Sequence, residues 1–226
     1  MFRPLVLVLI SALAAPAIAA PTATTPPAQT AKAPAKAPAK APAKAGPGVA
    51  AVKDANDTIS ALLKQKVAAG SKEEKELAQK VTSSVRGFLD IDQLGKRAMV
   101  DNWSKLSKAQ QEQFQKLLRD LIEENYIRGL RANLSYEVEY IGETSDKDSN
   151  TIVTTKIKTV RKGRPYSIAV DYVLVKEGAK LRAYDIKTDG VGLVENYRTM
   201  FNKIIAKDGF DGLIAKMKKK QATSGT

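Results

Sequence analysis

The spacing of apolar residues changes once along this chain, and that change limits the folds it can adopt. Before Asn133, apolar residues recur every three or four positions, as in the run from Phe114 to Leu130, and this spacing marks one face of a helix. After Asn133, apolar and polar residues alternate, most clearly from Tyr166 to Leu174, which is the period of a half-buried strand. A helical N-terminal half followed by strands predicts the α+β class.

Capping patterns predict where the helices of the first half begin. Ser71-x-x-Glu74, Asp90-x-x-Gln93 and Ser107-x-x-Gln110 each place a side-chain acceptor three residues ahead of a glutamate or glutamine. This arrangement satisfies the free N–H groups of a first helical turn. An earlier helix is expected from near Ala50, with Gly70 stopping it.

The segment after Asp90 allows two further interpretations. The helix that Asp90 opens is expected to hold Leu94, Met99 and Trp103. Asp90 and Asp92 could also be viewed as paired catalytic carboxylates, but a helix-capping role already explains Asp90.

Alternating segments predict four strands. They lie at Tyr136–Tyr140, Val153–Ile157, Tyr166–Leu174 and in the stretch that begins at Leu181. The turns between them, at Arg161–Arg164 and Glu177–Ala179, are short, so consecutive strands should pair as antiparallel hairpins. We expect a curved four-stranded antiparallel sheet with one apolar face, which the helices before and after it must cover.

The C-terminal part is expected to be helical. Asp189-Gly190 ends the last strand, and from Leu193 apolar residues return to helical spacing up to a stop around Asp208-Gly209. A shorter amphipathic segment follows and ends in lysines, which suit a helix C-terminus. We place the folded domain at residues 49–220 and a disordered tail at 221–226.

The first 48 residues do not look globular. Residues 1–20 combine Arg3, an apolar run and the small-residue site Ala17-Ile18-Ala19, which is typical of a cleavable signal peptide; an uncleaved N-terminal anchor is the alternative. Residues 21–48 repeat alanine, lysine and proline and have no core-forming residues, so a solvated linker is expected. It is either an inert spacer or a contact to anionic wall polymer.

The formal charge of +13 favours anionic partners, but a secreted chain is not expected to bind nucleic acid.

Cysteine and histidine are both absent. Their absence excludes disulfides, thiolate catalysis and a cysteine-linked lipid anchor, and it removes the usual general base and the commonest metal ligand. Asp146–Asn150 begins like a calcium loop, but Thr151 and Ile157 stand where that motif has glycine and an acid. We expect a polar hairpin turn there, no metal, no cofactor and no enzymatic activity.

The strand-to-helix junction carries a family resemblance. Tyr184-Asp185-Ile186, Gly190-Val191-Gly192-Leu193-Val194 and Asn196-Tyr197-Arg198 resemble the signature of the toluene-tolerance family, and the similarity extends over roughly Asp54 to Lys218. That family includes the periplasmic phospholipid-binding component of the Mla (maintenance of lipid asymmetry) ABC transport system. The chain departs from the family pattern at Leu181, where tryptophan is usual, and at Gly192, where serine is usual. The missing serine hydroxyl bears on ligand preference.

The resemblance implies a periplasmic lipid carrier with an apolar pocket between sheet and helices. It would hold the acyl chains of a phospholipid and pass the lipid between an outer-membrane lipoprotein complex and an inner-membrane ABC transporter with its MCE-type lipid-binding ring. A hopanoid is an alternative ligand. The residue pattern alone favours an ordinary filled core, as in a non-enzymatic cell-envelope interaction module whose linker binds wall or membrane polymer.

If the pocket exists, the apolar faces identify its lining. The expected lipid-binding residues are Met99, Trp103, Phe114, Leu117, Leu121, Tyr136, Val138, Val153, Ile157, Ile168, Val170, Tyr172, Leu174, Leu193, Tyr197 and Phe201. The motif residues Asp185, Gly190, Asn196 and Arg198 are expected to be structural. Arg198 pairs locally with Glu195, ties the last helix to the sheet through Asp185 or Asp171, or contacts a headgroup.

Overall fold

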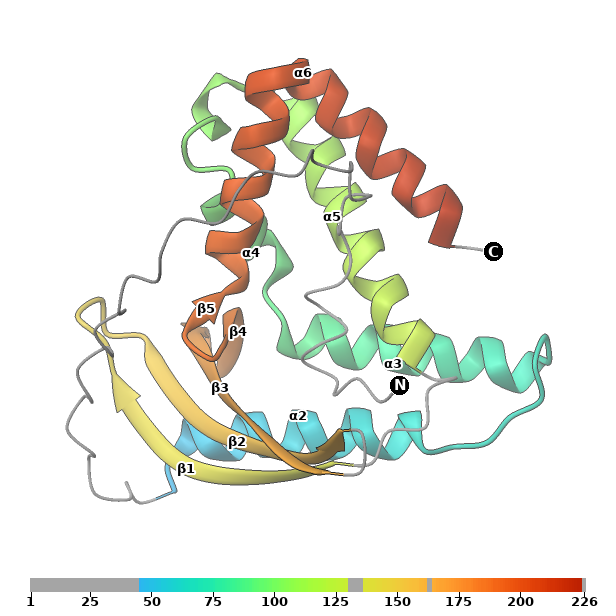
Figure 1. Ribbon diagram of the computed structural model, residues 1–226, viewed down its shortest axis with the longest axis vertical. Coiled ribbons are helices and arrows are strands. Elements are labelled where there is room, and N and C mark those ends of the chain that lie inside the picture. Colours follow the sequence, from blue (N-terminus) through green and yellow to red (C-terminus); the bar gives the residue numbers. More distant parts are fainter. Residues whose placement is uncertain (1–44, 130–135, 162–163, 225–226) are drawn as a thin grey trace, which may run out of the picture.

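The structure is a computed structural model that describes residues 45–129, 136–161 and 164–224. The expected signal peptide and the linker before Ala45 lie outside the described residues, as does the centre of the turn expected at Arg161–Arg164. The elements, in chain order, are α2 (Pro47–Leu63), α3 (Lys72–Phe88), α4 (Ile91–Ala98), the 3₁₀ helix η1 (Trp103–Lys105), α5 (Lys108–Gly129), β1 (Glu137–Ser145), β2 (Thr151–Arg161), β3 (Arg164–Glu177), β4 (Lys180–Thr188), β5 (Val191–Gly192) and α6 (Leu193–Ser224). The α+β class predicted from the sequence is confirmed (Figure 1).

The three predicted helix starts are confirmed. The Ser71 hydroxyl accepts a hydrogen bond from the Glu74 N–H at 3.1 Å, and Asp90 Oδ1 accepts one from the Gln93 N–H at 2.9 Å. At α5 the capping box is reciprocal, because the Ser107 hydroxyl accepts the Gln110 N–H while Gln110 Oε1 accepts the Ser107 N–H. Each bond satisfies an N–H group that the first turn leaves without a helical partner.

Two helix boundaries in the first half differ from expectation. Helix α2 begins at Pro47 and ends at Leu63, so Gly70 does not stop it. Proline suits a first helical position because its missing N–H has no helical partner to lose. Helix α4 ends at Ala98, so Met99 is its C-cap and Trp103 lies in η1.

Helix α6 runs further than predicted. It is broken near the expected stop, since Gly209 has a φ of 71° that only glycine adopts without strain. The helix then continues through Ser224, so residues 221–224 of the expected tail are helical.

The sheet has five antiparallel strands in the order β1-β2-β3-β4-β5, and the prediction of four was one too few. The extra strand arises at Asp189 and Gly190, which have φ values of 48° and 86°. Two successive positive φ values make a tight hairpin turn, for which Asp-Gly is a preferred sequence. The chain therefore folds back after β4, and Val191 pairs with Thr188.

One face of the sheet is buried and the other is mostly exposed, as the alternation predicted. We call the buried side the inner face. Its fully buried members are Val153, Thr155, Ile157, Ile168, Val170, Tyr172 and Leu174. Their neighbours on the opposite face, such as Lys156 and Ala169, are exposed. The sheet is curved (Figure 1), and register shifts interrupt pairing after Tyr140 in β1 and at Val173–Leu174 of β3, where bulges help strands to bend.

Helix α2 is the principal cover of the inner face, in contact with β1, β2 and β4. We expected the C-terminal helix to lie back on the sheet as well. Instead α6 packs mainly on α4 and α5 and touches the sheet at β4 and β5 (Figure 1). Its apolar stripe is covered by other helices, which the period of one segment cannot reveal.

Candidate functional site

The site begins with the inner face and the helix that covers it. The buried side chains of α2 are those of Val49, Val52, Asn56, Ile59 and Leu63. They follow one another at steps of three or four, so they form one row along the helix. This row and the inner face bury a surface that is apolar except for Asn56, Thr155 and the tyrosine hydroxyls.

The first turn of α2 is fixed to β1 and β2. The Glu143 carboxylate accepts a hydrogen bond from the Val49 N–H at 2.8 Å, which places a negative charge at the positive end of the helix. Gly48 allows the close approach, because a Cβ there would lie 2.6 Å from the Thr151 methyl carbon and 2.7 Å from Glu143 Oε2. The N-terminal end of α2 is therefore anchored to the sheet.

A groove of about 530 Å³ lies beside α2. Its lining comes from α2, from the C-terminal part of α3, and from the turn before β4 and the start of that strand: Pro47, Ala50, Ala51, Asp54, Ala55, Thr58, Ser84, Gly87, Phe88, Ala179, Lys180 and Leu181. The volume is within the range of about 300–1,000 Å³ of small-molecule sites. Small side chains line much of it, and none of these residues was among the predicted lining residues.

Phe88 connects the groove to the inner face. It lines the groove, and its ring centroid lies 6.0 Å from that of Tyr172, which belongs to the inner face. Because Phe88 is itself 8% exposed, it separates the open groove from the buried surface behind it.

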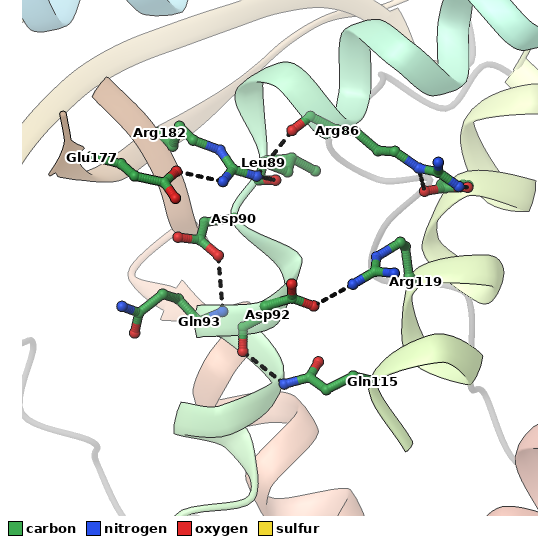
Figure 2. Close-up of polar contacts among 10 residues, drawn as sticks. Arg86, Leu89, Asp90, Asp92, Gln93, Gln115, Arg119, Glu177 and Arg182 are labelled. Carbon is green, nitrogen blue, oxygen red and sulfur yellow. Dashed lines mark hydrogen bonds and ion pairs between the residues drawn. The ribbon is translucent and has the colours of Figure 1, made fainter. Parts of the chain in front are cut away.

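A hydrogen-bond network holds the end of α3 against β4 (Figure 2). Arg182 Nη2 donates to the carbonyl oxygens of Arg86 at 2.9 Å and Leu89 at 2.7 Å, while Nη1 donates to Glu177. The Asp90 N–H donates to the Ala183 carbonyl at 2.8 Å. Arg182 thus satisfies carbonyls at the C-terminal end of α3 and fixes the groove wall that carries Phe88.

The Asp90 and Asp92 carboxylates do not pair with each other, because each one hydrogen-bonds to a different structural partner. Asp90 caps α4, as predicted, and Asp92 accepts from Arg119 of α5 at 2.7 Å (Figure 2). Gln115 donates to the Asp92 carbonyl at 2.9 Å. These contacts tie α4 to α5.

A polar cluster interrupts the apolar surface under α2. The Asn56 amide nitrogen donates to the Tyr140 hydroxyl at 3.3 Å and to the Tyr172 hydroxyl at 3.5 Å. Burial raises the pKa of Tyr172, so its hydroxyl stays protonated. The sequence interpretation included Tyr172 only as an apolar residue and missed Asn56. A signal was present, since Asn56 lies four residues after Val52 and three before Ile59 on the apolar row.

The sixteen predicted lining residues all belong to the core or pack against it, but they fall into two groups. Eight lie on or next to the strands: Tyr136, Val138, Val153, Ile157, Ile168, Val170, Tyr172 and Leu174. The other eight, Met99, Trp103, Phe114, Leu117, Leu121, Leu193, Tyr197 and Phe201, lie on or between α4, η1, α5 and α6. The structure therefore brings the first group together under α2 and gathers the second group among the helices.

Aromatic contacts organise the second group. Phe114 and Phe201 meet edge to face with centroids 5.3 Å apart, Tyr197 stacks on Phe201 at 5.4 Å, and Trp103 contacts Phe114 at 6.3 Å. These distances are those of favourable aromatic pairs. The four rings join η1, α5 and α6.

The strand-to-helix motif is held by Asp185. Its Oδ1 accepts a hydrogen bond from the Val194 N–H at 3.1 Å, at the N-terminus of α6. A Cβ at Gly192 would lie 2.6 Å from Asp185 Oδ2, so the carboxylate occupies the space that a serine side chain would need. Burial raises the pKa of Asp185. Asn196, which the sequence interpretation grouped with these motif residues, is exposed.

Arg198 has a partner that the sequence interpretation did not consider. Its Nε and Nη2 donate to the Asp101 carboxylate at 2.7 and 2.6 Å, and Asn202 donates to the same carboxylate at 2.7 Å. Arg198 therefore ties α6 to the segment between α4 and η1, and the expected partners Glu195, Asp185 and Asp171 were wrong. Hydrogen bonds from Arg198 and Asn202 lower the pKa of Asp101 to about 2.

The loop that begins like a calcium motif is a hairpin turn. Asp146 Oδ1 accepts hydrogen bonds from the N–H groups of Asp148 and Asn150, both at 2.9 Å. No group of three acidic side chains that could hold a metal ion occurs in residues 45–129, 136–161 and 164–224. Within the same ranges, none of the helices has the length and apolar character to cross a membrane.

Comparison with known proteins identifies relatives. The model of the MlaC protein family matches residues 53–219, close to the span of the resemblance seen in the sequence. No match was found among curated proteins. Among solved structures, a phospholipid-binding protein from Ralstonia solanacearum, determined in complex with a phospholipid, is similar with a TM-score of 0.63. The two sequences are 25% identical, and the alignment covers 78% of this chain and 98% of that chain.

Proposed function

This chain belongs to the MlaC protein family, and from that premise we propose that it carries phospholipid by holding the acyl chains between its sheet and its helices. The observation that carries the proposal is the apolar inner face beside an open groove. Val153, Ile157 and Val170 are buried apolar residues of this face, and the groove of about 530 Å³ is separated from the face by Phe88, whose ring contacts Tyr172. A phospholipid bound to the similar solved structure supports the same ligand class.

Binding in this proposal is burial without covalent chemistry. Two sixteen-carbon chains contain about 28 methylenes, and at ~0.8 kcal/mol each their removal from water is worth on the order of 20 kcal/mol. A lipid held so strongly does not leave into water at a useful rate. Loading and release therefore require direct transfer to partners that have apolar conduits of their own.

The family membership suggests those partners and the location. We propose that the mature protein works in the periplasm after removal of its signal peptide. There it would pass lipid between an outer-membrane lipoprotein complex and an inner-membrane ABC transporter with an MCE-type ring. The domain's surplus of lysine and arginine suits anionic headgroups or acidic docking patches.

One observation favours a second candidate. The inner-face residues Val153, Val170 and Leu174 are fully buried under their covering elements, as in a filled core. The same burial of these residues is expected in a cell-envelope interaction module that has a filled core and no ligand.

Native mass spectrometry of protein purified from cells separates the two candidates. The carrier predicts a population with an added mass of one diacyl phospholipid, which is lost when the sample is denatured. Protein that carries no lipid-sized increment under gentle ionisation, and that takes up none from phospholipid vesicles, contradicts the carrier.

A further inference from the structure

Asn56 stands out because it places an amide in the apolar row of α2. Its neighbours in that row are Val49, Val52, Ile59 and Leu63. Only 8% of Asn56 is exposed, and a buried amide costs free energy unless its hydrogen bonds are good.

The hydrogen bonds of Asn56 are long. At 3.3 and 3.5 Å to the Tyr140 and Tyr172 hydroxyls, both exceed the usual N–H to O distance of about 2.9–3.0 Å. Both tyrosines accept in these bonds, so each still has an O–H hydrogen to donate. Among the described residues, neither hydrogen has an acceptor within hydrogen-bond distance. The cluster therefore holds two donors that a better acceptor would satisfy.

The cluster spans the boundary between buried and wet surface. Tyr172 is 3% exposed and contacts Phe88 of the groove wall, whereas Tyr140 is only partly buried. Ala55, the residue before Asn56, lines the groove itself. A ligand with apolar chains on the inner face would place its first polar atoms beside these hydroxyls.

We propose that Asn56, Tyr140 and Tyr172 bind the ester carbonyls that join the acyl chains of a glycerolipid to its backbone. This inference rests on the proposed carrier function and adds the part of the ligand that is recognised. An ester carbonyl accepts hydrogen bonds from phenol hydroxyls, while an ether-linked chain or a hopanoid offers no carbonyl at that position. The cluster thus selects ester-linked diacyl lipids over apolar molecules of similar size.

The experiment is a competition between two lipids that differ only in this linkage. The mature protein is mixed with equal amounts of a diester and a diether phosphatidylglycerol of the same chain length, and native mass spectrometry gives the ratio of the two complexes. A net gain of one buried hydrogen bond predicts a preference of about two- to tenfold for the diester. Tyr172→Phe and Tyr140→Phe each remove one donor while keeping the ring, and the preference should fall toward one.

Tyr184→Phe is the matched control. Tyr184 is a buried tyrosine outside the inner face, where Arg97 lies over its ring at 4.2 Å from the centroid. Loss of its hydroxyl should leave the lipid ratio unchanged. A role of the cluster that is only structural predicts that all three variants keep the wild-type ratio.

The outcomes separate the two proposals. Equal capture of both lipids by the wild-type protein, or an unchanged ratio in whichever phenylalanine variants fold, overturns the ester assignment and leaves the carrier standing. Capture of neither lipid by the wild-type protein overturns the carrier function, and the ester assignment with it.

Discussion

Replacing Arg182 by methionine tests how the wall of the groove is held. The change keeps most of the apolar stem and removes the guanidinium, and with it the hydrogen bonds to the Arg86 and Leu89 carbonyls at 2.9 and 2.7 Å (Figure 2). The lost contacts lie at the C-terminal end of α3, directly beside Phe88.

The expected loss follows from these contacts. Hydrogen bonds from a charged donor are worth about 1.5–3 kcal/mol each, so two are worth about 3–6 kcal/mol. The buried Arg182 Nε has no partner among the described residues, and an unsatisfied buried donor costs about 1–3 kcal/mol. Because the side chain is also 22% exposed, we expect a net loss of about 2–3 kcal/mol, or roughly 4–12 °C in Tm for a domain of this size.

Glu177→Gln is the control for the ion pair. The Glu177 side chain is 58% exposed, and exposed ion pairs contribute about 0–1 kcal/mol. Thermal unfolding followed by circular dichroism should therefore show a small shift for Glu177→Gln and a large one for Arg182→Met. Equal shifts in the two variants would refute the reasoning, because the carbonyl contacts would then contribute nothing.

Three further predictions use the same preparations. Val170→Trp should expel co-purified lipid from a folded protein, whereas in a filled core it costs about 1–3 kcal/mol; Asp171→Leu, on the opposite face, should leave the lipid content unchanged. Because Arg198 and Asn202 lower the pKa of Asp101 from 3.8 to about 2, the stability that this carboxylate contributes is complete above about pH 4 and is lost as the pH falls through 2. The difference in Tm between wild type and Asp101→Asn should therefore shrink over that interval, and a constant difference contradicts the assignment. Deleting residues 21–44, which lack core-forming side chains, should leave Tm and lipid content unchanged; a large loss would mean that the segment packs on the domain.

Local signals in the sequence predicted the features that depend on local chemistry. The caps at Ser71, Asp90 and Ser107 were identified because each pattern satisfies hydrogen bonds within its own first turn. The inner face was predicted from the two-residue period of β2 and β3. In both cases all the interacting groups lie within a few residues or follow a fixed period.

Features that depend on distant parts of the chain were not predicted. The sequence shows that Leu193, Tyr197 and Phe201 form a stripe, but not that α4 and α5 cover most of that stripe instead of the sheet. Arg198 and Asp101 are 97 positions apart, so no local rule pairs them. The groove residues were not predicted because most of them are small or polar, and such residues give no hydrophobic signal in the sequence.

The fifth strand and Gly192 each had a local signal in the sequence, but that signal was interpreted incompletely. Asp189-Gly190 is a hairpin signal, yet it was interpreted only as a break because the following strand has just two residues. Gly192 was interpreted as a lost serine hydroxyl, whereas the structure shows that the Asp185 carboxylate fills the position. Both corrections require the position of β4, which is set by the whole sheet.

The central claim is that acyl chains lie against the inner face of the sheet, and photo-crosslinking tests it most directly. A phospholipid with a photoreactive group near the end of one acyl chain is loaded into the mature protein, and the crosslinked peptides are mapped by mass spectrometry. Acyl chains in that position predict crosslinks to β2, β3 and α2, at inner-face residues such as Ile157 and Val170. Crosslinks confined to the exposed face, at residues such as Lys156 and Ala169, would contradict it.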